Sequence, residues 1–290
     1  MILVTKKFEN SPSILVSENC KKKIATSIKE QKHEGDYFYK HEEVKKYLRT
    51  KIYHKKCCYC ESNSEAVAPF QVEHYRPKGK ITEETSHKGY YWLGRIWSNL
   101  VLACFWCNNH KDTQFPLSND GIRVHQPSLQ ADGTLDFVKS QAHQPPLSTE
   151  KPLLLHPEID DPKKHLYYLP NGEIKALSKR GQTTMDICKL NREQLIIDRK
   201  EFLDNYFDRM EDELNDFAAK KTTNKEFARC LINIFKGIFL LSNHTKKFSY
   251  LGFYFFRYFP RFILEYDRFG PKRKKLLVKA YYHFLKTYKP

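Results

Sequence analysis

The sequence predicts an α+β protein in which a small cysteine-stapled core joins N-terminal helices to a mostly α-helical C-terminal region. Two Cys-x-x-Cys pairs stand 43 residues apart, turn-forming residues recur from 113 to 185, and apolar residues at helical spacing begin near 191. The chain therefore divides into an N-terminal helical arm over 1–56, a core domain with a loop and hairpin extension over 57–187, and a helical, basic and aromatic region over 188–290.

The N-terminal arm is polar and contains two helix-compatible stretches, 19–30 and 41–54. In the second stretch Val44, Leu48 and Ile52 recur at helical spacing, which predicts one thin apolar face. The chain before these stretches has no such pattern, so we expect it to be extended or irregular.

The core domain is marked by four of the eight cysteines, which form two pairs: Cys57 with Cys60, and Cys104 with Cys107. Thiolates bind Zn²⁺ tetrahedrally, so two such pairs make one closed structural zinc site with no open position for chemistry. Free thiols are the alternative, but two pairs around a long insert favour zinc in a reducing compartment over a disulfide framework. Cys58 is out of register and is left out of the site.

Beyond the core, two short apolar stretches around Pro170-Asn171-Gly172 predict a hairpin. Two helix starts follow, because Asn191 with Gln194 and Thr223 with Glu226 both resemble capping boxes. After the first start, apolar residues keep to one face for about seven turns.

The net charge and the apolar runs bear on partners and location. The formal charge is +16 over 290 residues. Such an excess favours nucleic acid as partner, because a Lys or Arg placed against a phosphate releases counterions; a basic surface without a target is the alternative. The most apolar runs, 231–241 and 248–259, are too short to span a bilayer and each contains a cation. With no signal-peptide pattern at the start, we expect a cytoplasmic protein without a membrane partner.

Glu73 and His74 form the candidate catalytic pair, at the end of a strand-like segment that starts at Pro69. Neighbours on a strand face opposite sides, but at a strand end both can reach one pocket. A carboxylate is a good ligand for Mg²⁺, and a neutral imidazole is a natural general base near pH 7. Phosphodiester hydrolysis needs both functions. Alone, the pair would be interpreted as an ordinary surface pair, but its position between the cysteine pairs favours a site.

Further polar residues surround this pair. Asn108 directly follows the last paired cysteine, so a bound zinc would hold its amide oxygen rigidly. Arg76, Lys78 and Lys111 are the cations that we predict to hold phosphate.

These motifs together resemble the HNH, or ββα-metal, endonuclease family. The matching elements are Cys57-x-x-Cys60, Glu73-His74-x-x-Pro77, Trp97-x-Asn99-Leu100 and Cys104-x-x-Cys107-Asn108-x-x-Lys111. The resemblance implies two strands and a helix around a structural zinc, with His74 as general base and Glu73 and Asn108 as ligands of one catalytic Mg²⁺ or Mn²⁺. It also implies that Asn99 braces the loop that orients the histidine. His110 lies close by and is the alternative ligand to Asn108.

A narrower resemblance extends further along the chain. It is carried by the segments at 73–78, 153–162, 171–174 and 190–199, which are similar to the PtuB-like HNH component of Septu-type and retron-linked anti-phage systems. It implies a nuclease that cleaves DNA, with other nucleic acids left open, beside an ABC-type ATPase that gates it.

Other interpretations compete with these. The chain could be a zinc-stapled nucleic-acid-binding or protein adaptor without turnover, or a toxin-like effector that a partner holds inactive. His156 with Asp160 and Asp161 invites a second metal site, but a capped acidic turn is the favoured interpretation. The aromatic residues between 248 and 266 are interpreted as core or partner interface rather than as a base-stacking surface.

Overall fold

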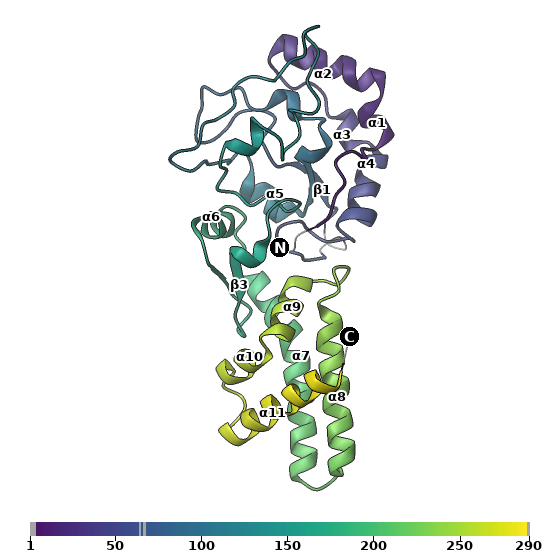
Figure 1. The fold of residues 1–290 in the computed structure, drawn as a ribbon, viewed down its shortest axis with the longest axis vertical. Coiled ribbons are helices and arrows are strands. Elements are labelled where there is room, and N and C mark those ends of the chain that lie inside the picture. Colours follow the sequence, from purple (N-terminus) through teal and green to yellow (C-terminus); the bar gives the residue numbers. More distant parts are fainter. Residues whose placement is uncertain (1–3, 64, 66–67, 289–290) are drawn as a thin grey trace. The chain divides into compact units, whose positions relative to one another are not determined.

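The computed structural model describes residues 4–63, 65 and 68–288. They form two compact units (Figure 1). The first runs to Leu166 and includes Ala176–Leu190, and the second comprises Tyr167–Lys175 and the chain from Asn191 onward. The two predicted segments 1–56 and 57–187 thus fall largely within one unit, whose end at Leu190 is near the predicted boundary.

Two antiparallel strands and a helix form the centre of the first unit (Figure 1). The strand β1 (Gln71–His74) pairs with β2 (Leu100–Ala103), and the helix α5 (Phe105–Lys111) follows directly. All four residues of β2 are buried, which explains their unbroken apolar sequence. The helix α5 begins at Phe105. The second Cys-x-x-Cys turn is itself the first helical turn, with extended Cys104 as its N-cap.

Short helices cover this centre. From the N-terminal arm come α1 (Ser13–Val16), α2 (Glu18–Glu30), α3 (Tyr37–Lys40), α4 (Glu42–Tyr47) and the π-helical turn η1 (Leu48–Ile52). The predicted apolar face of the arm is confirmed, because Val44, Leu48 and Ile52 are all buried. The prediction that no helix precedes residue 19 was wrong, since α1 lies there and α2 begins after Ser17, which accepts the Cys20 N–H.

The remaining elements of the first unit are short. They are the 3₁₀ turns η2 (Tyr91–Leu93), η3 (Trp97–Asn99), η4 (Leu147–Thr149) and η5 (Pro162–Lys164), and the helix α6 (Lys179–Ile187). The predicted hairpin is confirmed as β3 (Leu166–Tyr168) and β4 (Ile174–Ala176), of which Tyr167–Lys175 belongs to the second unit. Its turn requires Gly172, which has a positive φ and lies so close to the Ile196 carbonyl that a Cβ would collide with it.

The second unit is helical around an aromatic core. Its helices are α7 (Glu193–Ala218), α8 (Asn224–Leu241), α9 (Ser249–Arg257), α10 (Phe259–Glu265) and α11 (Pro271–Thr287). Most of the aromatic residues interpreted as core are buried, among them Phe248, Phe255, Phe259 and Phe262. No helix within the described ranges is long and apolar enough to cross a bilayer.

The two predicted helix starts of this unit differ in outcome. The capping box of Thr223 and Glu226 is present at the start of α8. The one predicted at Asn191 was wrong, because α7 begins after Arg192 without a side-chain cap. The Asn191 amide instead accepts from the backbone N–H of Ile174 and donates to its carbonyl, which fastens the hairpin.

Candidate functional site

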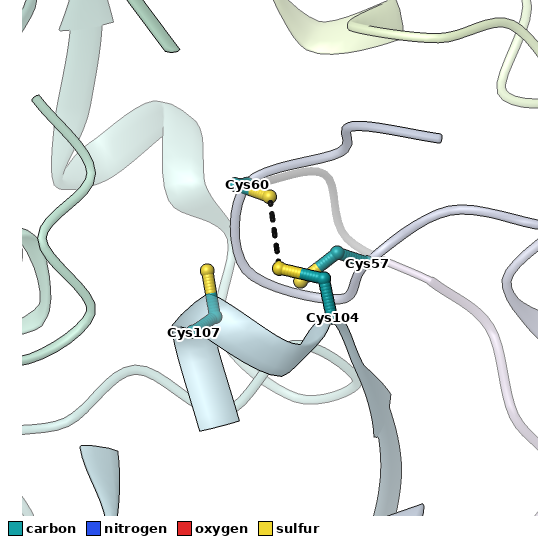
Figure 2. Close-up of side chains that lie close together, drawn as sticks. All are labelled: Cys57, Cys60, Cys104 and Cys107. Carbon is teal, nitrogen blue, oxygen red and sulfur yellow. Dashed lines mark hydrogen bonds between the residues drawn. The ribbon is translucent and has the colours of Figure 1, made fainter. Parts of the chain in front are cut away.

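The four paired cysteines converge at the start of α5 (Figure 2). The Sγ atoms of Cys57, Cys60, Cys104 and Cys107 all lie within 4.8 Å of one another, and all four residues are buried. The Sγ atoms of Cys60 and Cys104 are 3.8 Å apart. A tetrahedral zinc with Zn–S bonds of about 2.3 Å separates its sulfur ligands by about 3.8 Å. The donor set and its spacing therefore fit one closed zinc site.

The first cysteine turn is fastened to the sheet by its backbone. The Cys58 N–H donates to the Leu102 carbonyl at 2.8 Å, and the Cys57 N–H donates to the Ser62 carbonyl at 3.1 Å. Burial raises the pKa of the Cys57 thiol well above its ordinary value, so in the metal-free protein this sulfur stays protonated. A bound cation would take the place of such protons.

Four of the predicted site residues line a single cavity. Glu73 and His74 at the end of β1, Lys78 beyond it and Asn108 on α5 all line a cavity of about 790 Å³. The strand end thus allows two neighbouring side chains to reach the same space.

His74 is fixed in one tautomer. Its Nε2 lies 3.0 Å from the Gly94 carbonyl oxygen, which can only accept, so Nε2 carries the hydrogen and Nδ1 keeps the lone pair. Burial, followed by the charge of Lys78, lowers the pKa of His74 well below its usual value. The ring of Tyr39 packs edge-on against it at 4.6 Å. The imidazole is therefore neutral near pH 7, which is the form that a general base requires.

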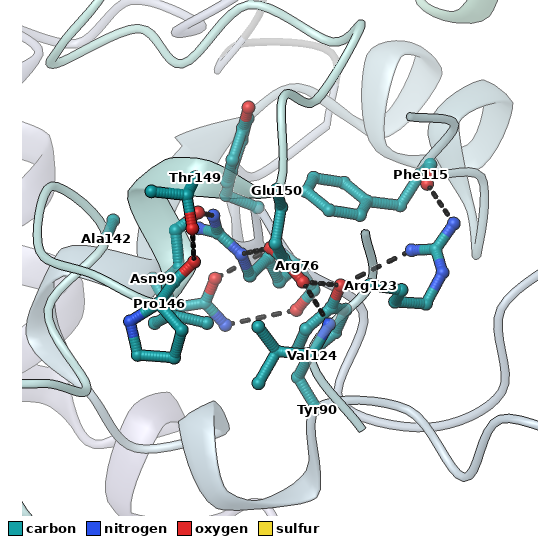
Figure 3. Close-up of polar contacts among 12 residues, drawn as sticks. Arg76, Tyr90, Asn99, Phe115, Arg123, Val124, Ala142, Pro146, Thr149 and Glu150 are labelled. Atoms are coloured by element: carbon teal, nitrogen blue, oxygen red, sulfur yellow. Dashed lines mark hydrogen bonds and ion pairs between the residues drawn. The ribbon is translucent and has the colours of Figure 1, made fainter. Parts of the chain in front are cut away.

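Asn99 ties together the two segments that orient His74. Its Oδ1 accepts from the Arg76 backbone N–H at 2.8 Å, and its Nδ2 donates to the Arg76 carbonyl at 3.0 Å (Figure 3). The same Nδ2 also donates to the Leu93 carbonyl at 3.3 Å. Arg76 follows the histidine by two residues, and Leu93 precedes Gly94. One buried amide thus bonds both to the segment after the strand end and to the segment before the acceptor of the imidazole, and the bracing role implied for Asn99 stays a prediction.

Glu73 on β1 and Asn108 on α5 line the same cavity. Gln71 and Glu73 share one face of β1, since side chains alternate along a strand. The Asn108 amide nitrogen donates to the Gln71 side-chain oxygen, which leaves its own oxygen as an acceptor or ligand. Glu73 Oε1 accepts from Lys111 Nζ at 2.7 Å, which leaves Oε2 as an acceptor or metal ligand. A carboxylate and an amide oxygen are a donor set suited to Mg²⁺ or Mn²⁺.

The three predicted phosphate ligands lie in different environments. Lys78 is half-buried, lines the cavity and pairs with Asp36 at 2.9 Å. Lys111 is buried between Glu73 and the His74 carbonyl, to which it donates at 2.9 Å. Arg76 is also buried and does not line the cavity. Among the three, only Lys78 lies where phosphate could reach it in this conformation, so the roles of the other two in binding phosphate stay predictions.

Arg76 belongs to a buried network that sequence reasoning missed (Figure 3). The carboxylate of Glu150 accepts from Arg76 Nε at 2.7 Å, from the Tyr90 hydroxyl at 2.5 Å and from the Val124 N–H at 2.9 Å. Arg76 also donates to the Leu147 carbonyl at 2.7 Å. The network fastens the loop extension to the segment that follows His74. No local pattern could reveal it, because Glu150 lies 74 residues from Arg76.

The competing ligands are placed elsewhere. His110 stacks on Trp106, with ring centroids 6.3 Å apart, and does not line the cavity, which favours Asn108. His156 donates from Nε2 to the Ser98 carbonyl and accepts at Nδ1 from the Glu158 N–H. In the part of the chain that the structure describes, the four cysteines are the one group of three or more His, Cys, Asp or Glu side chains placed to hold a metal. The contacts of His156 support the turn interpretation.

Comparison with known proteins identifies similar chains. No family model matches. The chain is 35% identical over 168 residues to Septu protein PtuB of Bacillus mycoides (strain KBAB4), a match that covers 56% of this chain and 51% of that protein. It is 27% identical over 157 residues to Septu protein PtuA of the same strain, which covers 53% of this chain and 20% of that protein. The chain thus spans about half the length of the first relative and a fifth of the second. The predicted PtuB-like resemblance is confirmed.

Proposed function

We propose that this chain is an HNH-type endonuclease that hydrolyses phosphodiester bonds of DNA with the aid of one divalent cation. One observation carries the proposal: a neutral imidazole of fixed tautomer, His74, lines the same cavity as a carboxylate and an amide on a cysteine-stapled β–β–α unit. An adaptor without turnover would not require that combination.

The residues divide the chemistry between them. His74 Nδ1 takes a proton from a water molecule, the resulting hydroxide attacks the phosphorus, and the P–O bond to one of the two sugar oxygens breaks while that leaving oxygen takes a proton from solvent water. Glu73 and Asn108 would hold Mg²⁺ or Mn²⁺, which supplies charge stabilisation for the phosphate as negative charge builds on its oxygens. Lys111 fixes one oxygen of Glu73 and the backbone of His74, so that base and metal ligand keep their relative positions. Asn99 bonds to the carbonyl of Leu93, the neighbour of Gly94, and so holds in place the carbonyl that orients the imidazole.

The similarity to Septu proteins supports a biological setting for this chemistry. We infer that the chain is the cytoplasmic nuclease effector of an anti-phage defence system and that an ABC-type ATPase of the same system gates it. The matches to both PtuB and PtuA support membership of such a system. The setting is inferred, since the chain covers only part of either relative.

Replacing the base tests the activity. His74→Ala should reduce the rate of plasmid nicking in Mg²⁺ or Mn²⁺ by roughly 10²- to 10⁴-fold, while the zinc content and the fold are kept. The matched control is His110→Ala, which removes a nearby imidazole that does not line the cavity. Undiminished cleavage by the first variant would contradict the proposal. If the wild-type chain cuts only when a co-purified ATPase is present, gating by that partner is supported.

A further inference from the structure

The first turn of α5 presents two exposed aromatic side chains. Phe105 is 43% exposed and Trp106 is 53% exposed, although the cysteines on either side of the pair are buried. The other two tryptophans of the chain, Trp92 and Trp97, are only 2% exposed. Because the other indole rings are buried, the exposure of Trp106 indicates that its ring is available to contact a ligand.

The two rings are held rigidly. They stand between two members of the cysteine cluster, and the Asn108 N–H donates to the Cys104 carbonyl at 3.0 Å to close the turn. Phe105 and Trp106 meet edge to face at 5.5 Å, and Trp106 stacks on His110 with an interplanar angle of 27°. A ring whose orientation is fixed in advance loses little conformational entropy when a planar ligand stacks on it.

The position of Phe105 and Trp106 indicates which kind of ligand they bind. Phe105 lines the same cavity as Glu73 and His74, so a strand whose phosphate lies at His74 also passes this ring. Lys45, which has no ion pair among the described residues, lines that cavity too and offers a charge to a neighbouring phosphate. A protein bound over Phe105 would obstruct the cavity, whereas a nucleobase beside the reacting phosphate would not.

We propose that Phe105 and Trp106 stack on unpaired bases of the strand being cut, so that the enzyme prefers single-stranded or locally unpaired DNA to continuous duplex. In a duplex the base faces are covered by their neighbours, whereas an unpaired base can stack on a protein ring. This inference rests on the proposed function and names the substrate class of the same site.

Binding without turnover tests it. In the full-length His74→Ala background, with Ca²⁺ in place of Mg²⁺, Trp106→Ala should weaken the binding of fluorescein-labelled oligo(dT) about tenfold and leave the binding of a blunt-ended, fully paired duplex unchanged. Trp106→Phe should recover most of the affinity. The matched control is Tyr37→Ala, because Tyr37 is an aromatic residue that is 65% exposed and lies on α3 rather than on the first turn of α5. Zinc content of each variant reports whether the cysteine turn has survived.

The outcomes separate this inference from the proposed function. Cleavage that depends on His74, combined with equal single-strand binding by Trp106→Ala, overturns the stacking surface alone. Loss of single-strand binding in Trp106→Ala, combined with cleavage that does not need His74, supports the surface and overturns the active site. If Trp106→Ala binds DNA like the parent protein but no longer co-purifies with a partner ATPase, the two rings form a protein interface and the stacking proposal is overturned. A wild-type chain that binds no oligo(dT) also overturns the stacking proposal.

Discussion

The cysteine cluster and the end of β1 lie on the same two strands and helix, yet different forces hold them in place. At the cluster, four buried sulfurs converge where a zinc ion can bind all of them. At the strand end, His74 is positioned by neutral hydrogen bonds to Gly94 and through Asn99, and Glu73 by one buried ion pair with Lys111. The first region depends on a metal, and the second on many individually modest contacts.

This difference predicts different responses to damage. Structural zinc binding contributes about 10–16 kcal/mol in small zinc domains, more than a typical domain's stability, so loss of one ligand affects folding. A single hydrogen bond contributes about 0.5–1.5 kcal/mol, so loss of one of the contacts that position His74 should leave a folded protein with a displaced imidazole. Changes at the cysteine cluster should therefore affect whether the first unit folds, whereas changes at the end of β1 should affect how precisely His74 is positioned.

The largest effect is expected at the cluster. Cys104→Ser should abolish stoichiometric zinc binding and unfold the first unit, because three ligands cannot close the tetrahedral site. Zinc content and thermal unfolding by circular dichroism measure this. Cys230→Ser on α8 is the control, since that cysteine lies outside the cluster. A normally folded Cys104→Ser protein without zinc would show that the staple is not needed.

The buried ion pair should come next. Lys111→Met leaves the Glu73 carboxylate without its partner and should destabilise the protein by about 3–5 kcal/mol in urea unfolding. Lys111→Met combined with Glu73→Gln should recover much of that loss, because neither buried charge remains. If Glu73 also holds the divalent cation, Mg²⁺ should stabilise Lys111→Met more than wild type and should not stabilise the double variant. Equal response of all three proteins to Mg²⁺ would remove Glu73 from the metal site.

The brace should have a smaller effect on stability. Asn99→Ala removes the partners of the Arg76 backbone and should cost about 1–3 kcal/mol, because those buried groups are left unsatisfied. Since the protein stays folded, cleavage should fall through kcat while the affinity for DNA is kept. Single-turnover cleavage and binding measured on one preparation test the split. A variant that loses affinity and rate in equal proportion would speak for a general folding defect.

Sequence reasoning located the residues whose chemistry is tied to their spacing. The four cysteines, the Glu73–His74 pair and the Thr223 cap were all visible because each is a particular side chain at a particular interval. The ββα order followed from a resemblance and agrees with the pairing of β1 and β2.

The rest depended on contacts that leave no local pattern. The Gly94 carbonyl that orients His74 is a backbone group, and any residue type supplies one. Arg76 and Lys111 were predicted to hold phosphate, and the structure shows both buried beside carboxylates, contacts that no local pattern reveals. The Asn191 cap was wrong because a distant hairpin competes for its amide.

The smallest expected effect is on stability at low pH. It comes from His156, a buried histidine outside the candidate site. Burial, followed by the charge of Lys6, lowers the pKa of His156 well below its usual value, so folding favours the neutral ring. Its contribution to stability is complete above the unfolded pKa, near 6.5, and is lost as the pH falls through the folded value. His156→Gln should therefore be less stable than wild type at pH 7.5 but show a shallower loss between pH 6.5 and 5. Zinc content measured at each pH separates this slope from acid release of the metal, and an unchanged slope with zinc still bound would assign acid sensitivity to the other buried histidines, His74 and His87.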